Sequence, residues 1–395
     1  MSENSITKVV VIGGGYAGAS AANRLQQRDD VEITLVNPRP EFVERIRLHQ
    51  FVAGNYDAGS DLGTVVGERV RVVVDGATRI DTGSRTVELA SGSALDYDYV
   101  IYAVGSTAAT PGAVPGATEF AYPIGEWEFA GRLRTAVAAM PSNGRITVVG
   151  GGLTGIETAS ELAEAGHAVT LVCGGRLAPT FLEPARRSLA KWLKKNGVEV
   201  VESLRVAEVR ADVVVLADGS VVPSAVTIWT AGFGVPELAA RSGLRTDKLG
   251  RLLTDETLTS ADDDRIIAAG DAAAPSGQPL RMSCQAAIPL GVQAAETVLS
   301  RIAGDRPAAL NIGFVASCVS LGRRAATMQI ARKDDTSTKY YVGGLVGAAL
   351  KEMICKGTVS AIRKEARKPG SISITKGDGN RPAQAEFERE VITHS

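Results

Sequence analysis

Two short runs of mostly β-branched residues begin the two halves of a repeated pattern. They are KVVVI (Lys8–Ile12) and RITVV (Arg145–Val149). Each run suits a strand buried on both faces, and each is followed by glycines and then by alanine and leucine at helical spacing. The pattern therefore predicts two strand-turn-helix units, over residues 8–25 and 145–162.

Further apolar runs are typical of the same kind of buried strand: EITLVN (Glu32–Asn37), AVTLVC (Ala168–Cys173), DYVIYAVGS (Asp98–Ser106), VTIWTAGFG (Val226–Gly234) and RIIAAGDAAA (Arg265–Ala274). The third and fourth bracket the second unit, which predicts two crossings between domains. In the last run we expect the strand to stop at Gly270 and Asp271 and a helix to follow. An aspartate there is either a turn or helix-capping residue or part of a site.

The chain after about Asp305 has a different pattern. Residues 313–332 alternate like two paired strands joined by a Gly-Arg-Arg turn, and residues 343–368 have the spacing of one or two helices with a basic end. From Pro369 onward, glycine, proline and charged residues predict a flexible tail. We therefore expect a small α+β domain at the C-terminus.

Glycines with a specific spacing lie in both predicted turns. They are Gly13, Gly15 and Gly18 in the first unit, and Gly150, Gly152 and Gly155 in the second. In this spacing the first glycine allows a tight turn, the second lets the backbone approach a diphosphate, and the third lets the helix pack on the strand. One such match is often an ordinary turn, but two copies in the same context favour two dinucleotide sites.

The residues that end the second strand of each unit bear on the nucleotide. A carboxylate usually binds the adenosine ribose at this position, but Asn37 and Cys173 stand there instead. Asn37 can still bond ribose hydroxyls. Because Cys173 does not repel a 2'-phosphate, we expect the second site to accept NADPH to within about tenfold of NADH. Arg176 either pairs with that phosphate or is a solvated loop residue.

Composition narrows the class of protein. With 395 residues, 45% of them hydrophobic, the chain is long enough for two or three domains, and its net charge of −1 gives no reason to expect a nucleic-acid partner. The four cysteines have no CxxC spacing, so neither a metal site nor a disulfide framework is predicted. The polar start and the absence of a long apolar run predict a cytoplasmic protein, at most peripheral to a membrane.

These motifs resemble the two-dinucleotide-binding-domain flavoproteins, the pyridine-nucleotide-dependent flavin oxidoreductases, from roughly Lys8 to Gly304. The resemblance implies two Rossmann-like domains, with an NAD(P)H-binding domain (109–230) inserted in an FAD-binding domain (1–108 and 231–304). A C-terminal domain (305–369) and a tail (370–395) would follow. It also implies that Asp271 bonds FAD and that Glu157 lies near the nicotinamide; the alternative for Glu157 is an exposed helix residue. The other cofactor-binding positions it implies are Ala17, Arg45, Ala103, Gly105, Thr154, Ala231, Gly232, Cys284 and Gln285.

The electron acceptor is the open question within this family. Residues 38–54 contain no redox cysteine, and Cys284 is a lone thiol, so neither disulfide reductases nor sulfide:quinone reductases fit. FVAG (Phe51–Gly54), GGLTGIE (Gly151–Glu157), IWTAG (Ile228–Gly232), AAGD (Ala268–Asp271) and MSCQAAIPLG (Met282–Gly291) are most similar to type II NADH dehydrogenases and their apoptosis-inducing-factor-like relatives.

Two departures from that subfamily affect the acceptor site. Gln285 is present, but Pro289 replaces the second glutamine of the quinone pocket, so we expect broad acceptor specificity and short quinones. Arg45, Arg47 and His49 either face a polar acceptor or pair with Glu41 and Glu44.

The resemblance implies an enzyme that takes hydride from NAD(P)H onto FAD and passes electrons to a quinone or another small acceptor, with Glu157 and Gln285 as catalytic residues. A redox-sensing flavoprotein with slow turnover and a reductase of a ferredoxin-like carrier remain alternatives. The apolar stripe over 345–362 and the basic residues beside it predict either weak association with the inner face of the membrane, or packing onto the flavin domain or a second subunit as in a homodimer.

Overall fold

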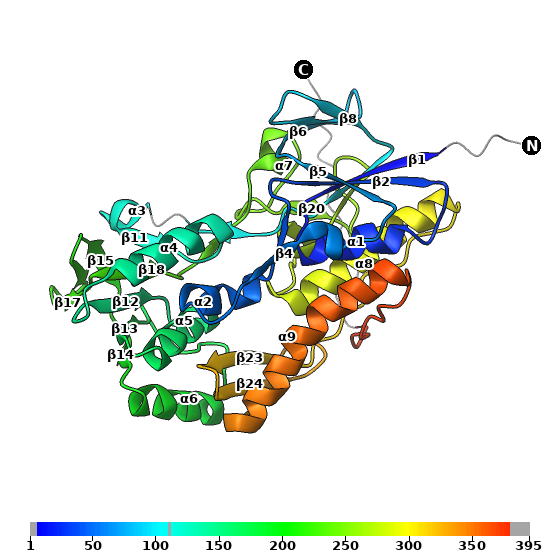
Figure 1. Cartoon of the computed structure of the whole chain (residues 1–395). Coiled ribbons are helices and arrows are strands. Elements are labelled where there is room, and N and C mark those ends of the chain that lie inside the picture. Colours follow the sequence, from blue (N-terminus) through cyan, green and yellow to red (C-terminus); the bar gives the residue numbers. More distant parts are fainter. Residues whose placement is uncertain (1–5, 110–111, 380–395) are drawn as a thin grey trace, which may run out of the picture.

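The computed structural model of this chain describes residues 6–109 and 112–379. Two parallel sheets form the centres of two lobes (Figure 1). The first sheet has the order β21 (Ile266–Ala268), β9 (Tyr99–Tyr102), β1 (Thr7–Ile12), β2 (Val31–Asn37) and β5 (Val70–Val74). Its order places β1 at the centre, as expected for a strand that is buried on both faces.

The second sheet repeats this arrangement. Its order is β11 (Ala121–Pro123), β18 (Val226–Trp229), β12 (Arg145–Val149), β13 (Ala168–Val172) and β14 (Glu199–Val201). In each unit the central strand leads directly into a helix, α1 (Tyr16–Leu25) in the first and α5 (Leu153–Glu164) in the second. The predicted α/β class and both strand-turn-helix units are confirmed.

A small antiparallel sheet follows the outer parallel strand of each unit. In the first unit it consists of β6 (Ala77–Asp81), β7 (Thr86–Leu89) and β8 (Ala94–Asp96), and in the second of β15 (Val206–Val209), β16 (Val213–Leu216) and β17 (Val221–Pro223). The two crossings between the lobes lie side by side, because β10 (Thr107–Ala108) pairs antiparallel with β19 (Phe233–Gly234). The second unit is therefore an insertion in the first.

The expectation of a helix directly after Asp271 is wrong. The chain makes one 3-10 turn, η3 (Gly270–Ala272), and then β22 (Ala273–Pro275), which pairs with β20 (Leu252–Thr254). The backbone groups of β22 thus bond those of β20 in place of a helix. Helix α8 begins only at Cys284 and runs to Ile302, and the Ser283 side chain accepts a hydrogen bond from Ala286 N at its start. Helix α8 lies against α1, where a side chain on Gly291 would collide with the carbonyl of Ala17.

The C-terminal segment connects the two lobes. The alternating stretch forms β23 (Ala316–Leu321) and β24 (Ala325–Ala331) as predicted, and β25 (Ser337–Gly343) adds a third antiparallel strand. The helical stretch is one long helix, α9 (Gly344–Arg367). Arg323 N donates to Glu164 of α5 (2.5 Å), whereas Glu365 at the other end of α9 pairs with Arg24 of α1 (2.5 Å).

The remaining elements are short connections or cover the sheets: β3 (Glu41–Val43), η1 (Arg45–Arg47), α2 (Leu48–Val52), β4 (Gly59–Asp61), η2 (Leu62–Thr64), α3 (Ala117–Phe120), α4 (Trp127–Ala139), α6 (Glu183–Lys195) and α7 (Leu238–Arg241).

The start of the predicted tail contacts the folded chain. Ile372 N donates to Glu365 (2.6 Å), and Gly313 N donates to Thr375 O (2.8 Å). Residues 380–395 of the tail lie outside the described residues. Across 6–109 and 112–379, none of the helices combines the length and the apolar character that crossing a bilayer requires.

Candidate active site

The two glycine loops follow β1 and β12 at the carboxyl ends of the parallel strands, the edge where α/β sheets bind ligands. Gly13 and Gly150 have positive φ angles of 105° and 125°, which favour glycine. A side chain on Gly18 would collide with the carbonyl of Gly13, and one on Gly155 with the carbonyl of Gly150. These four positions are therefore fixed by the turn and by the packing of helix on strand.

Gly15 and Gly152 face open space instead. Apart from the adjacent backbone, no atom of the described residues lies within 4 Å of a Cβ built on either glycine. Each is the N-cap of its helix, and within the described chain no side chain caps either helix start. Unpaired N–H groups beside open space fit a diphosphate at both loops.

Asn37 is fixed against the first loop. Its side-chain oxygen accepts a hydrogen bond from Gly14 N (2.9 Å), and its amide nitrogen donates to Arg39 O (2.6 Å). The structure thus places this residue at the glycine loop, with both ends of its amide bonded to the backbone, and its contact with the ribose stays a prediction.

Asp271 and Arg45, from distant parts of the first unit, both bond to Ser106. Asp271 accepts a hydrogen bond from the Ser106 hydroxyl (2.7 Å), and Arg45 donates to the Ser106 carbonyl (2.8 Å) and to Gly125 O (2.9 Å). Burial raises the pKa of Asp271, while the Ser106 hydroxyl and Arg45 act in the opposite direction. Gly105, with φ of 71°, would bring a Cβ to 3.8 Å from the Arg45 guanidinium.

A second polar cluster lies one helical turn further along the same segment. His49 of α2 is 4% exposed, and its Nδ1 lies 3.8 Å from Glu157 Oε2 of α5. Glu157 Oε1 pairs with Lys351 of α9 and accepts a hydrogen bond from Ser320 N (3.0 Å). The interpretation of Glu157 as an exposed helix residue is therefore wrong, because its side chain is only 13% exposed.

Burial sets the protonation of this cluster. It holds the pKa of His49 well below its usual value, helped by the nearby cations Lys351 and Arg323, so the imidazole is neutral. Among the described residues, His49 Nε2 has no hydrogen-bond partner. Burial also lowers the pKa of Lys351 to about 8. A lysine with this pKa can exchange a proton near neutral pH.

Arg47 connects the same segment to α9. Its side chain is 1% exposed, its guanidinium pairs with Glu352 at 3.1 Å, and its Nε lies 3.3 Å from Glu44. Pairing with Glu44 therefore holds for Arg47, but Arg45 bonds carbonyl groups instead.

The start of α8 faces the C-terminal sheet. The Gln285 amide nitrogen can donate to Ala316 O at 3.0 Å while its oxygen accepts from Val315 N at 3.2 Å. Cys284 lies beside Thr358 of α9, and burial raises its pKa to about 11. Burial likewise raises the pKa of Cys318 to about 12 and the pKa of Cys355. These neutral thiols do not suit disulfide chemistry.

The other predicted positions lie at the two loops and at the crossings. Thr154 is in the first turn of α5, and Ala17 is in the first turn of α1. Ala231, whose carbonyl accepts from Trp229 (2.9 Å), and Gly232, with φ of 83°, immediately precede β19. Ala103 follows β9 and lies against the turn at Gly13. Arg176 points toward α6, where it pairs with Glu183 at 2.9 Å.

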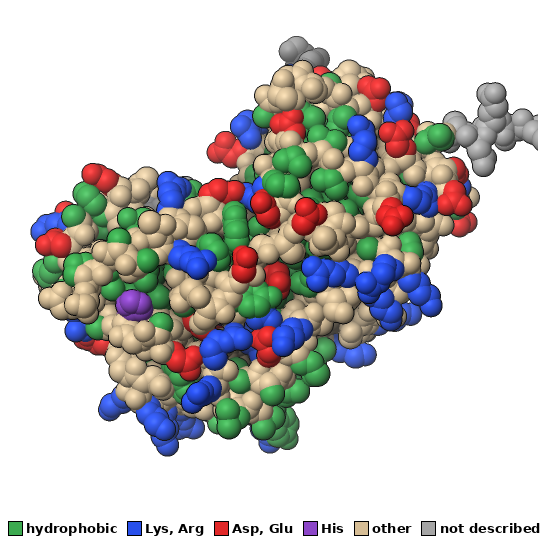
Figure 2. All heavy atoms as spheres, viewed as in Figure 1, with side chains coloured by type: hydrophobic (Ala, Val, Ile, Leu, Met, Phe, Trp, Pro, Cys, Tyr) green, Lys and Arg blue, Asp and Glu red, His purple; other side chains and the backbone are tan. Residues whose placement is uncertain are grey.

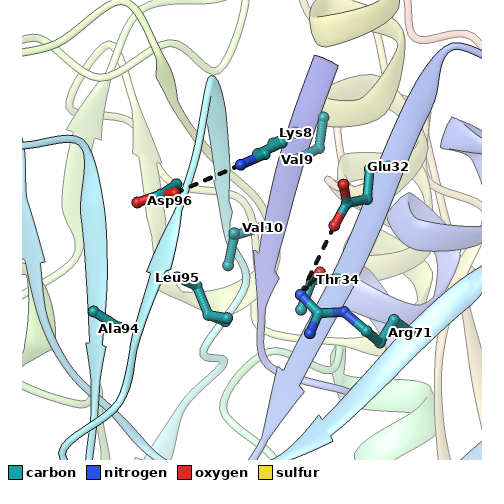
Figure 3. Close-up of a pocket in the computed structure, with 9 residues that line it drawn as sticks. All are labelled: Lys8, Val9, Val10, Glu32, Thr34, Arg71, Ala94, Leu95 and Asp96. Atoms are coloured by element: carbon teal, nitrogen blue, oxygen red, sulfur yellow. Dashed lines mark hydrogen bonds and ion pairs between the residues drawn. The ribbon is translucent and has the colours of Figure 1, made fainter. Parts of the chain in front are cut away.

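A groove of about 170 Å³ lies near the opposite ends of the first sheet's strands, between β1, β2, β5 and β8 (Figure 3). Its cations are paired, Lys8 with Asp96 at 3.5 Å and Arg71 with Glu32 at 3.9 Å. It is away from the glycine loops, so it is not part of the dinucleotide site.

Ser106 and Lys351 were not singled out from the sequence. Ser106 ends a strand that the sequence did predict, so its position was the available signal. No signal in the sequence marked Lys351, because it lies 194 residues from Glu157 and looks like one of several basic residues on a helix.

The chain is similar to several known proteins. The family model described as pyridine nucleotide-disulphide oxidoreductase matches residues 7–291. The NADH dehydrogenase-like protein Rv1812c of Mycobacterium tuberculosis (strain ATCC 25618 / H37Rv) is 31% identical over 352 residues, which cover 81% of this chain and 87% of that protein. The type II NADH:quinone oxidoreductase of Staphylococcus haemolyticus (strain JCSC1435) is 28% identical, with 87% of this chain and 98% of that protein covered.

The fold is also that of a solved oxidoreductase. The sulfide:quinone oxidoreductase of Aquifex aeolicus superimposes with a TM-score of 0.79 at 18% identity, covering 96% of this chain and 99% of that one. As expected from the sequence, the cofactors implied are FAD and NAD(P)H, and the reaction is an NAD(P)H-dependent oxidoreduction. The chain belongs to the pyridine nucleotide-disulphide oxidoreductase family.

Proposed function

We propose that this protein transfers electrons from NAD(P)H through FAD to a quinone-type acceptor. The observation that carries the proposal is the short segment from Arg45 to His49. Its first residue joins the Ser106–Asp271 pair of the first unit, and its last residue faces Glu157 of the second unit. One short segment thus contacts both units.

The residues of the first unit would hold FAD. Gly15 N and the following N–H groups of α1 would bind the diphosphate, and Asp271 would accept hydrogen bonds from the flavin chain. In this proposal residues 1–108 and 231–304 bind FAD, residues 109–230 bind NAD(P)H at Gly152, and residues 305–369 form the C-terminal domain.

FAD, when bound, accepts hydride from NAD(P)H and delivers two electrons to the acceptor. A quinone takes up two protons with these electrons, so its reduction needs a proton donor. Lys351 has a pKa of about 8 and is held by Glu157. We assign it to hold and release one of these protons, and Gln285 to position α8 beside the acceptor.

The exposed side chains of helix α9 also favour contact with a membrane surface. Leu345, Val346 and Met353 are 72%, 63% and 62% exposed. Lysines and arginines gather over the C-terminal half of the same helix and over α6 (Figure 2). An apolar strip with cations beside it fits peripheral binding to anionic lipid on the cytoplasmic face, where lipid quinones are found.

The experiment is anaerobic reduction of the flavin by NADH or NADPH, followed by mixing with a short-chain quinone, a long-chain quinone or oxygen. We expect the quinones to reoxidise the flavin faster than oxygen does. A reduced complex that persists in the presence of both quinones would contradict the proposal and favour a redox-sensing protein. Reoxidation only by an added ferredoxin-like carrier would identify a carrier reductase.

A further inference from the structure

The carboxylate of Glu202 lies beside Cys173, at the carboxyl ends of the strands of the second sheet. The strand that leads to Cys173 has no carboxylate of its own at this position. Strands β13 and β14 are parallel neighbours with Val172 opposite Val201, so Cys173 and Glu202 follow at the same edge. Cys173 N donates to Val201 O at 2.8 Å, which continues the ladder to this point.

Glu202 is fixed in this position. Its Oε1 accepts a hydrogen bond from Leu177 N (2.7 Å), and the next residue, Ser203, donates through its N–H to Gly175 O (2.9 Å). Burial raises the pKa of the Cys173 thiol to about 12, and the negative charge of Glu202 acts in the same direction. The carboxylate therefore lies close enough for its field to reach Cys173.

Cys173 in turn touches the glycine loop. A Cβ built on Gly151 would lie 2.7 Å from the Cys173 Cβ. Gly151 is directly before Gly152, the N-cap of α5, where the diphosphate of a dinucleotide would bind. Glu202 thus belongs to the part of the site that receives the adenosine ribose.

The basic residue of the same loop is turned away. Arg176 is 63% exposed at its side chain and pairs with Glu183 of α6, which also pairs with Arg186. Its charge is directed toward α6, whereas Glu202 is bonded to the loop itself. At the ribose position the fixed charge is therefore negative.

We propose that Glu202 replaces the carboxylate missing at the end of β13 and makes the enzyme select NADH over NADPH. This inference rests on the proposed binding of NAD(P)H at the second loop. A fixed carboxylate accepts hydrogen bonds from the ribose hydroxyls and repels a 2'-phosphate. We expect kcat/KM for NADH to exceed that for NADPH by roughly tenfold or more. This replaces the expectation from Cys173 alone that the two nucleotides compete closely.

The test compares kcat/KM for NADH and NADPH in the wild-type holoenzyme and in three variants. Glu202→Gln keeps an acceptor for Leu177 N but removes the charge, so the preference for NADH should narrow roughly tenfold, through a lower KM for NADPH. Glu199→Gln is the matched control, because Glu199 is on the same strand but pairs with Arg145 (3.3 Å) at the other end. Arg176→Ala should also leave the preference unchanged.

Binding of nucleotide fragments to the wild-type holoenzyme provides a readout that needs no turnover. By calorimetry, ADP-ribose should bind roughly tenfold or more tightly than its 2'-phosphate. Equal binding of the two fragments, or a preference that survives Glu202→Gln and changes with Arg176→Ala, would overturn the assignment of Glu202. If neither fragment binds, the proposed nucleotide site fails, and the assignment of Glu202 fails with it.

Discussion

The buried pair of Glu157 and Lys351 gives the sharpest quantitative prediction. Their side chains are 13% and 10% exposed, and they join α5 of the inserted unit to α9 of the C-terminal segment. Lys351→Met leaves the Glu157 carboxylate buried without its cation, which typically costs about 3–5 kcal/mol. Glu157→Gln also removes the partner of Lys351, but this lysine, whose pKa burial already lowers to about 8, can then lose its proton, so the cost should be smaller.

The double variant should be much less damaging. Gln at position 157 can still accept the hydrogen bond from Ser320 N (3.0 Å), and Met fills the space of the lysine chain. Replacing both charges of a buried pair is often nearly neutral, so we expect a cost of about 1 kcal/mol. In a double-mutant cycle, the double variant should therefore lose much less free energy of unfolding than the two single variants lose together.

Urea unfolding at saturating FAD, followed by circular dichroism, would measure these costs. Hydrogen exchange of α9 amides would show whether the loss is local to this helix, which matters because a chain of several domains need not unfold in one step. Lys356→Met is the matched control, since Lys356 is 74% exposed and pairs with Glu352 on the same helix (3.5 Å). It should change little. Additive costs for the two single variants would refute the reasoning.

Three further outcomes are expected. Gly15→Val should give a folded protein that lacks flavin, because the Cβ of the new side chain enters the open space at the start of α1; wild-type flavin content, measured by absorbance, would contradict this. The rate of flavin reoxidation by quinone should fall as the pH rises through about 8, since Lys351 then loses its proton. In Lys351→Met, stopped-flow measurements should show no such fall in the rate around this pH. Leu345→Ser combined with Met353→Ser should reduce cosedimentation with anionic vesicles, and undiminished binding of this variant would show that α9 is not the contact.

The parts of the fold that could be predicted from the sequence depend on local patterns. The strands at Lys8 and Arg145, their glycine turns and the hairpin at 316–331 all follow from residue spacing within one element. The helix expected after Asp271 failed because β22 pairs with β20, and that pairing involves a segment with no marked pattern.

The candidate site was predictable only where a motif carried it. Gly15, Gly152 and Asp271 belong to recognisable turns, and the structure places them at strand ends as expected. The pairing of Glu157 with Lys351 and the approach of Glu202 to Cys173 depend on how separate elements pack. Neither pairing leaves a periodicity in the sequence, because each residue follows the ordinary pattern of its own element.

The C-terminal segment has a consequence for motion. Alone, the two-stranded ribbon of β10 and β19 would form a narrow hinge about which the inserted unit could swing. Two contacts far from the hinge oppose this rotation. Arg323 N bonds Glu164 on one lobe, and Glu365 bonds Arg24 on the other. Rotation would have to break the exposed hydrogen bond from Arg323 N at one end of this brace and the buried pair of Arg24 and Glu365 at the other. Nucleotide thus enters a geometry that is already set, and its binding should occur in a single kinetic phase, without a slow closing step.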